Sequence, residues 1–240
     1  MIYRINDFNV EDNSIAYGFA DGSLNFSPEN LSDRKKLLGL IPLSAEIGAH
    51  IYEVRQVHGN DIAILNENSD NLLSLTGADG IFTQKSGAIL CIRTADCVPV
   101  LFTSLEDRTI GAVHCGWKGT YGNIIKNVKD TLINKFNSDL DKIAVMIGPS
   151  ICKKCYEVKE NFLNLFMAKN PANMDFFTKN IDNDKITFDL KEFIKNELYL
   201  SGFDEKNIYD INKCSLEDNN FYSYRRNKTN KRQVSFIVNL

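Results

Sequence analysis

Histidine is scarce in this chain, whose 240 residues include only His50, His58 and His114. Any site that uses imidazole must therefore draw on these three side chains. Long apolar runs are missing too, so no segment is predicted to cross a membrane. The first residues lack the apolar stretch of a signal peptide, and we therefore expect a cytoplasmic location.

A basic excess is also missing. The chain has 28 Lys and Arg residues against 31 Asp and Glu residues, mixed along its length, and a net charge of −3. Proteins that bind nucleic acid generally carry a basic patch or stripe, so we expect neither nucleic acid nor a membrane as a partner. With 43% hydrophobic residues the chain can bury a sizeable core, and no linker divides it, so we expect a single domain over 1–240.

Cysteine occurs six times, and nothing in the sequence points to an oxidising compartment. We therefore expect reduced thiols rather than a disulfide framework. Cys152 and Cys155 have the C-x-x-C spacing of some zinc sites, but the second C-x-x-C that would complete a four-cysteine site is absent. We interpret this pair as incidental, and we predict that Cys115, Cys152 and Cys155 take no part in catalysis.

Strand-like runs dominate the first half of the chain, and helical periodicity appears in the second. Short apolar runs bounded by turn residues predict strands at 15–20, 51–57, 61–65, 80–83, 88–93, 98–103, 109–114, 142–148 and 232–240. Apolar residues at helical spacing predict helices at 119–136, 157–168 and 189–200, the last with Asp189 as N-cap, and a loop and helix over 24–39. Several strands are apolar throughout, which indicates cover on both faces. The pattern is that of a mixed α/β chain.

Three residues that can bind a metal stand beside turns at the ends of apolar strands: His58, Cys97 and His114. Sites are commonly built at such turns. Two imidazoles and one thiolate supply three ligands of a tetrahedral zinc ion and leave one position open, which is typical of catalytic zinc. Cys97 and His114 could instead form a nucleophile and its base, or each could be a buried structural residue. The spacing leaves these alternatives open.

Two further segments have the chemistry of anion or ring binding. Lys118 lies in a glycine-rich turn before a predicted helix, where backbone N–H groups and the helix dipole attract anions. The alternative is a turn that needs glycine for its shape. Tyr224, Arg225 and Arg226 end an aromatic run, and aromatic rings suit a purine whereas guanidinium groups suit phosphate. The alternative there is an edge strand with solvated arginines.

Nine segments between positions 56 and 226 closely resemble one family, first named for laccase or polyphenol oxidase activity and now associated with purine nucleoside phosphorolysis. The segments are Gln56-Val57-His58-Gly59, Ala78-Asp79-Gly80, Thr94-Ala95-Asp96-Cys97-Val98-Pro99-Val100, His114-Cys115-Gly116-Trp117-Lys118-Gly119, Ile147-Gly148-Pro149-Ser150-Ile151, Cys155-Tyr156-Glu157-Val158, Asp189-Leu190, Cys214-Ser215 and Phe221-Tyr222-Ser223-Tyr224-Arg225-Arg226. The third and fourth segments are the most specific. Departures from the family pattern are small: Cys115 replaces a usual alanine, Ser215 replaces a usual threonine, and 230–232 replaces a Gly-Arg pair.

The resemblance implies a layered α/β/β/α sandwich with mixed sheets and one zinc ion bound by His58, Cys97 and His114. It implies phosphorolysis of adenosine, inosine and guanosine to the base and ribose 1-phosphate. Methylthioadenosine phosphorolysis and adenosine deamination are implied as companion activities. On this basis the candidate catalytic residues are Cys97, His114, Asp79 and Asp96. The candidate substrate or phosphate ligands are Lys118, Tyr224, Arg225 and Arg226, of which we favour Arg225 for phosphate.

Other functions are weighed against this one. A true multicopper oxidase needs several copper sites, which three histidines cannot furnish. A cysteine hydrolase would use Cys97 as nucleophile and His114 as base, for example on cell-wall precursors. A zinc-stabilised binding module would hold the metal and turn over no nucleoside. Metal content separates the hydrolase from the others, because a zinc ion on Cys97 removes the free thiolate.

Overall fold

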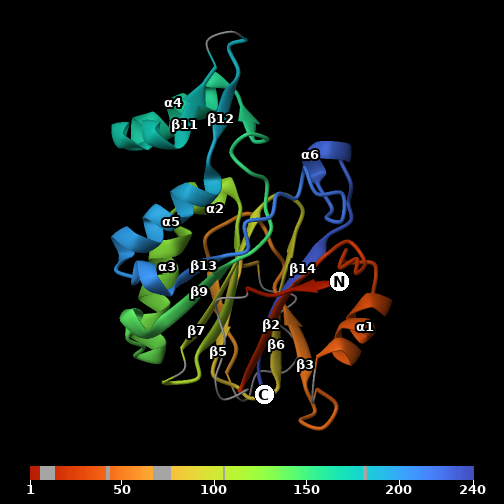
Figure 1. The fold of residues 1–240 in the computed structure, drawn as a ribbon. Helices are drawn as coiled ribbons and strands as arrows, with labels where there is room; N and C mark the ends of the chain where they lie inside the picture. Colours follow the sequence, from red (N-terminus) through yellow and green to blue (C-terminus); the bar gives the residue numbers. More distant parts are fainter. Residues whose placement is uncertain (6–13, 42–43, 67–76, 105, 181–182) are drawn as a thin grey trace.

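The apolar runs form two mixed β-sheets that pack face to face (Figure 1). The computed structural model describes residues 1–5, 14–41, 44–66, 77–104, 106–180 and 183–240. The five-stranded sheet has the order β1 (Ile2–Tyr3), β2 (Ile15–Ala20), β14 (Gln233–Asn239), β6 (Ala88–Thr94), β3 (His50–Glu53). The six-stranded sheet has the order β13 (Ile208–Asp210), β9 (Ile143–Ile147), β7 (Val98–Ser104), β8 (Ile110–Cys115), β5 (Gly80–Thr83), β4 (Ile62–Ile64).

Both sheets contain parallel and antiparallel pairs. In the five-stranded sheet β14 is antiparallel to β2 and β6, whereas β3 is parallel to β6. In the six-stranded sheet β7 is antiparallel to β8 and β9, and the edge strands β13 and β4 are parallel to their neighbours. The C-terminal strand β14 thus lies between β2 and β6, and the prediction of mixed sheets is confirmed.

The central strands are apolar on both faces because both faces are covered. Alternate side chains of a strand point to opposite faces of its sheet. In β7, Leu101 lies in the cluster between the sheets, whereas Val100 and Phe102 lie in the cluster under the helices. In β14, Ile237 lies between the sheets and Phe236 lies on the opposite face. This double cover explains why the runs show no polar alternation.

Helices cover the outer faces of both sheets. α3 (Ile124–Thr131) and α5 (Leu190–Ser201) pack on the six-stranded sheet, and α1 (Ser32–Leu40) packs on the five-stranded sheet through Leu37. The layers are therefore α/β/β/α, as expected. A small sheet of β10 (Glu157–Val158), β12 (Ile186–Phe188) and β11 (Phe177–Lys179) stands beyond one end of the sandwich with α4 (Glu160–Lys169) (Figure 1). Within the described ranges, no helix has the length and apolar character needed to cross a bilayer.

The single helix predicted over 119–136 is wrong. α2 (Trp117–Tyr121) ends at Gly122, and α3 begins only after Asn123, whose φ of 67° is left-handed. Asparagine adopts this conformation more readily than most residues, and it breaks the run of helical hydrogen bonds. A wider turn over Leu132–Phe136 follows α3. The helical spacing of apolar residues therefore holds within α3, where Ile124, Ile125 and Val128 are buried.

Other boundaries differ from the predictions by a few residues. The strand predicted over 51–57 ends at Glu53, and the helix predicted from 157 begins at Glu160, because Glu157–Val158 pairs with β12. The sequence does not predict the short strands β1, β10, β11, β12 and β13. The run Tyr224–Asn227 forms the short helix α6 rather than an edge strand. The Asp189 N-cap is confirmed, since its carboxylate accepts a hydrogen bond from the Glu192 backbone N–H at 3.1 Å.

Candidate active site

The two sheets bring His58, Cys97 and His114 together. Cys97 directly precedes β7, and His114 lies in β8 opposite Pro99, so strand pairing places the start of β7 beside the end of β8. His58 lies in the loop that follows β3. One ligand atom from each of the three residues lies within 4.8 Å of the others. The two imidazole rings meet edge to face with their centres 4.8 Å apart.

Asp79 fixes the positions of both histidines. Its carboxylate is fully buried, and Oδ1 accepts hydrogen bonds from His114 Nδ1 at 2.7 Å and from the His58 backbone N–H at 3.0 Å. Oδ2 accepts from the backbone N–H groups of Gly59 at 2.6 Å and Val57 at 3.1 Å. The His58 loop is thereby held with a left-handed φ of 58° at His58. Since Nδ1 of His114 is engaged, Nε2 is the nitrogen left for the cluster.

The surroundings favour the charged forms of Cys97 and His114. Burial opposes ionisation of the Cys97 thiol, but His114 and His58 lower its pKa to about 6. Burial likewise opposes the imidazolium, but Cys97 and Asp79 raise the pKa of His114 to about 9. Burial also opposes the Asp79 carboxylate, yet hydrogen bonds from His114 and the backbone hold its pKa below the usual range. The site thus presents a thiolate, which is the form of cysteine that ligates metals and attacks electrophiles.

The glycines of the turn after β8 leave room for the cluster. A Cβ at Gly116 would lie 3.3 Å from Cys97 Sγ, from a carbon of the His114 ring and from a carbon of the His58 ring. A Cβ at Gly119 would collide with the Gly59 carbonyl oxygen. The glycine-rich turn therefore has the shape that the two adjoining loops require.

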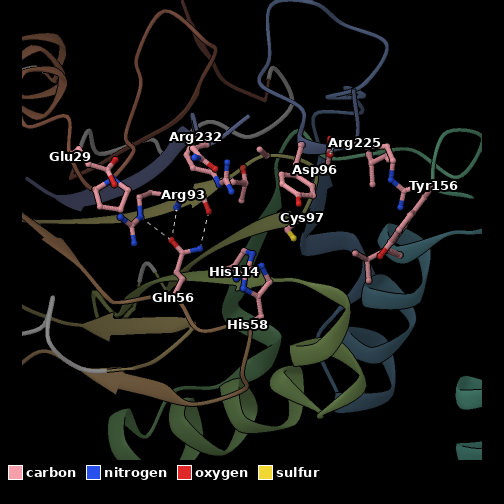
Figure 2. A pocket seen from close by; sticks show the side chains of 17 residues that line it. Glu29, Gln56, His58, Arg93, Asp96, Cys97, His114, Tyr156, Arg225 and Arg232 are labelled. Carbon is pink, nitrogen blue, oxygen red and sulfur yellow. Dashed lines mark hydrogen bonds between the residues drawn. The ribbon is translucent and has the colours of Figure 1, made fainter. Parts of the chain in front are cut away.

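A pocket of about 640 Å³ lies over the three residues (Figure 2). Tyr156 and Arg225 line one end, and the other end is lined by Glu29, Gln56, Arg93 and Arg232. The cluster lies between these ends, with Cys97, His58 and His114 directed into the space. The volume falls in the range of roughly 300–1,000 Å³ that is common for small-molecule sites.

Asp96 and Arg225 are joined at the pocket wall. Asp96 adopts a φ of 88°, and its carboxylate accepts from the Arg225 backbone N–H at 2.6 Å and from Ser215 Oγ at 2.8 Å. The Arg225 guanidinium donates to the Glu157 carbonyl at 2.7 Å and lies 5.2 Å from the centre of the Tyr156 ring. These contacts hold a positive charge over an aromatic face at the end of the pocket. Tyr224 lines the pocket beside it.

Two of the predicted substrate ligands do not line this pocket. Lys118 is exposed, and its Nζ lies 5.8 Å from the Trp117 ring centre. The Arg226 guanidinium donates to the carbonyls of Phe221 at 2.6 Å and Leu216 at 2.9 Å, so it holds a turn of the chain. Both residues are near site residues in the sequence, but the side chain of Lys118 is exposed and that of Arg226 bonds backbone carbonyls outside the pocket.

The structure also places in the pocket lining residues that the sequence had not singled out as ligands, among them Gln56, Arg93, Tyr156 and Arg232. Gln56 is anchored to Arg93, accepting from its backbone N–H at 2.9 Å and donating to its carbonyl at 2.8 Å. Gln56 and Tyr156 lie in segments that resemble the family, so the resemblance could have identified them as pocket residues. Arg93 directly precedes the Thr94–Val100 segment, and Arg232 ends the stretch 230–232 that departs from the family pattern.

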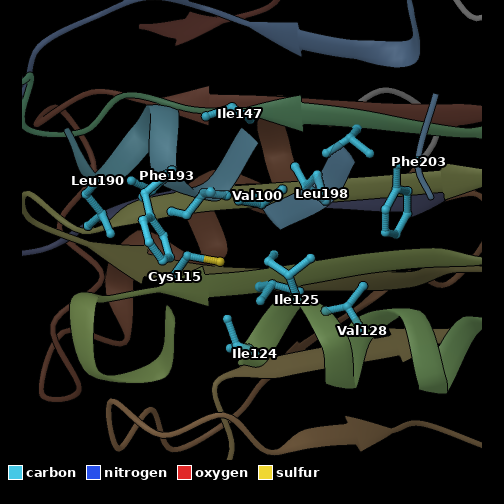
Figure 3. Packing of buried hydrophobic residues seen from close by; sticks show 14 of the residues in the cluster. Val100, Cys115, Ile124, Ile125, Val128, Ile147, Leu190, Phe193, Leu198 and Phe203 are labelled. Atoms are coloured by element: carbon cyan, nitrogen blue, oxygen red, sulfur yellow. The ribbon is translucent and has the colours of Figure 1, made fainter. Parts of the chain in front are cut away.

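The remaining cysteines fall into two groups, the buried Cys91 and Cys115 and the partly exposed Cys152, Cys155 and Cys214. Cys115 is fully buried among core residues such as Val100 and Ile124, and burial raises the pKa of its thiol (Figure 3). Cys152 and Cys155 are not isolated, because Cys214 and Glu217 lie beside them and one ligand atom from each residue lies within 4.8 Å of the others. Burial opposes ionisation of the Cys214 thiol, but the backbone N–H groups of Glu217 and Cys152 bond its sulfur and hold its pKa below the usual value.

Comparison with known proteins gives matches over most of the chain. Residues 29–239 match a family described as multi-copper polyphenol oxidoreductase laccase. A Rickettsia conorii protein named purine nucleoside phosphorylase RC0672 is 35% identical over 207 residues, which are 86% of this chain and 81% of that protein. A protein from an unknown prokaryotic organism, named adenosine deaminase RL5, is 28% identical over 233 residues, covering 90% and 88%. The crystal structure of Bacillus licheniformis hypothetical protein YfiH superposes with a TM-score of 0.82 at 25% identity, covering 95% and 94%.

Proposed function

The chain belongs to the family described as multi-copper polyphenol oxidoreductase laccase, and we propose that within this family it is a zinc-dependent purine nucleoside phosphorylase. Its substrates would be phosphate and adenosine, inosine or guanosine, and its products the free base and ribose 1-phosphate. The observation that carries the proposal is the meeting of His58, Cys97 and His114 in a pocket whose wall presents the Arg225 guanidinium. The name of the Rickettsia relative supports it.

The donor set fits one zinc ion. Two imidazole nitrogens and one thiolate sulfur are typical zinc ligands, and three protein ligands leave a position for water or substrate. The Asp79 carboxylate on His114 Nδ1 is the outer partner that orients a metal-binding histidine. A zinc ion bound there would supply Lewis-acid chemistry and lower the pKa of a coordinated water to about 7. The third histidine, His50, lies on β3 and does not line the pocket, so the chain lacks the imidazoles of a multicopper centre.

The chain's own residues would position the two substrates. Phosphorolysis breaks the glycosidic bond while phosphate attacks the anomeric carbon, through a state with oxocarbenium character similar to that of glycoside hydrolysis. Arg225 offers a fork of N–H donors to phosphate, and its backbone is held by Asp96. Tyr156 and Tyr224 offer ring faces for the purine or sugar. In this proposal the pocket would supply an anion site and stacking surfaces beside the cluster.

We extend the proposal to two companion reactions at the same pocket. Methylthioadenosine phosphorolysis would use the same phosphate and purine contacts. Adenosine deamination replaces the amino group by a water oxygen, and the name of the relative RL5 supports this activity. Because deamination needs no phosphate, Arg225 would matter for phosphorolysis and much less for deamination.

Product identification tests the proposal. Metal-analysed protein is incubated with adenosine, inosine or guanosine, with and without phosphate, and the products are separated by chromatography. We expect free base and ribose 1-phosphate only with phosphate, and inosine from adenosine in both conditions. Cys97→Ala should lose the zinc ion of the pocket and both activities together, whereas Cys91→Ala, at a buried cysteine of β6 outside the pocket, should keep them. Bound zinc without turnover of any nucleoside would instead indicate a binding module.

A second candidate function is favoured by one specific observation. Cys97, His114 and Asp79 are arranged as the nucleophile, base and orienting carboxylate of a cysteine hydrolase, with a depressed Cys97 pKa. The two functions differ in the state of the Cys97 sulfur. A phosphorylase with zinc should react with iodoacetamide at Cys97 only after chelation. Rapid labelling of Cys97 in the protein as purified, without any zinc, would favour the hydrolase.

A further inference from the structure

A second group of metal-binding side chains forms where two chain segments leave neighbouring strands. β13 runs parallel to β9, so the segments that follow both strands lie side by side. The pairing continues past the strands, since the Ser150 backbone N–H donates to the Lys213 carbonyl at 3.2 Å and the Ser215 N–H donates to the Ser150 carbonyl at 3.0 Å. This continuation sets Cys152 next to Cys214, 62 positions further along the chain.

The local backbone then gathers four donors at one point. The Cys155 backbone N–H donates to the Cys152 carbonyl at 3.0 Å, which closes a tight turn between the two cysteines. The Cys152 N–H donates to Cys214 Sγ at 3.4 Å, and Cys152 Sγ lies 3.8 Å from Glu217 Oε2. Three sulfurs and one carboxylate oxygen lie within 4.8 Å of one another.

We propose that Cys152, Cys155, Cys214 and Glu217 bind a second zinc ion, separate from the one at the pocket. Thiolate-rich sets select zinc among the common divalent ions, and four protein ligands close the tetrahedron, which is the pattern of a structural site. The pocket cluster differs, because its three protein ligands leave one position open. The second C-x-x-C that the sequence lacked is replaced by one cysteine and one glutamate from a distant segment.

The charge of the neighbouring sequence matches such a site. Three thiolates and a carboxylate around a zinc ion leave a doubly negative centre. Lys153 and Lys154 stand between the two cysteines of the turn, and Lys213 directly precedes Cys214. These lysines supply compensating positive charge on both segments that the ion would join.

The proposed ion would fasten a wall of the pocket. The Ile151 backbone N–H donates to the Asp96 carbonyl at 2.9 Å, and Ser215 Oγ donates to the Asp96 carboxylate at 2.8 Å. Ile151 precedes Cys152, Ser215 follows Cys214, and Asp96 adjoins Cys97. An ion that joins the two segments therefore holds the frame around Asp96, while its ligands remain outside the pocket lining.

Metal stoichiometry tests the proposal. The full chain is produced with zinc, dialysed, and analysed for zinc per chain in the parent, in Cys152→Ser/Cys155→Ser, in Cys97→Ala and in the control Cys91→Ala. We expect two zinc ions in the parent and the control, and one in each of the other variants. Parent zinc content in the double variant would overturn the proposal. A parent lighter by two hydrogens, with the bond mapped between these cysteines, would replace the site by a disulfide and also overturn it.

A second measurement works even if the double variant fails to fold. Cys97→Ala is loaded with Co²⁺, whose thiolate complexes absorb through sulfur-to-metal charge transfer that grows with the number of thiolates. The single remaining ion should show the intensity of three thiolates, and Glu217→Gln added to this variant should weaken its retention against a chelator. Absence of a thiolate band would contradict the proposal. Because Cys97→Ala lacks the pocket site, this result is independent of the phosphorylase proposal.

Discussion

Replacing Asp79 by asparagine removes one charge from the residue that orients both histidines. The carboxylate accepts four hydrogen bonds, two at each oxygen. An asparagine amide can accept at only one of these positions, because its NH2 group is a donor. If the NH2 group takes the place of Oδ2, it faces the backbone N–H donors of Val57 and Gly59, and neither hydrogen bond can form. If it replaces Oδ1, it opposes the His58 N–H and forces the His114 proton onto Nε2, the nitrogen needed for zinc.

The first orientation loses two charge-assisted bonds in a fully buried place, and the second loses one and reverses the other. At roughly 1.5–3 kcal/mol for each bond, the loss is roughly 3–6 kcal/mol in the first orientation and at least roughly 1.5–3 kcal/mol in the second, against a typical unfolding free energy of about 5–15 kcal/mol. Loss of an outer partner of a metal-binding histidine typically lowers metal affinity by about 10–100-fold. We expect Asp79→Asn to lower the melting temperature of the metal-free protein and to lower zinc affinity by that factor.

Zinc affinity is measured by competition with a chelator, alongside thermal unfolding of the metal-free protein. Asp107→Asn is the matched control, because Asp107 also accepts a backbone hydrogen bond, from Thr109 at 2.7 Å, in a turn outside the pocket. It should leave zinc affinity unchanged. An Asp79→Asn protein that binds zinc as tightly as the parent would refute the assignment of Asp79 as the orienting residue.

Three further predictions concern the same pocket. Arg225→Ala should raise the KM for phosphate by about 10- to 150-fold, the equivalent of one charge-assisted hydrogen bond, with zinc content unchanged, whereas Lys118→Ala should leave phosphate kinetics at the parent level. In metal-free protein the lowered pKa of Cys97 means that its thiolate is present above pH about 6 and is lost as the pH falls through that value. The rate of Cys97 alkylation, measured against pH, should therefore have its midpoint at about pH 6. A midpoint near the ordinary value of 9.0 would count against the charged pair of Cys97 and His114. Gly116→Ala should lose zinc affinity because its Cβ would press on the three ligands, whereas Gly39→Ala, whose Cβ meets nothing within 4 Å, should not; equal zinc binding by both variants would contradict the steric argument.

The main layers of the fold follow from local sequence, but several boundaries do not. Continuous apolar runs predict buried strands because both sheet faces are covered, and this holds for β7 and β9. The break before α3 depends on the left-handed Asn123, which the apolar period conceals. The short strands β11 and β12 become strands only by pairing with each other and with β10, and three residues give too little pattern to predict that.

The candidate site divides in the same way. His58, Cys97 and His114 could be predicted because each stands beside a turn at a strand end. Whether Lys118 reaches the pocket depends on the direction of α2, which the glycine-rich turn does not fix. The meeting of Cys152 with Cys214 depends on the parallel pairing of β13 with β9, and no local pattern carries that register. Strand pairing between distant segments thus determines which side chains meet, and composition and local spacing do not reveal it.

The most direct test of the central claim is the formation of ribose 1-phosphate from adenosine by zinc-loaded protein, measured against phosphate concentration in the parent and in His58→Ala. His58 would be a ligand of the zinc ion, and its side chain takes no part in the hydrogen bond between His114 and Asp79, although it helps to lower the pKa of Cys97. The account predicts phosphate-dependent ribose 1-phosphate from the parent and its loss, together with the zinc ion of the pocket, in His58→Ala. No phosphate-dependent product from the zinc-loaded parent, or parent rates in a His58→Ala variant that lacks the zinc ion of the pocket, would contradict it.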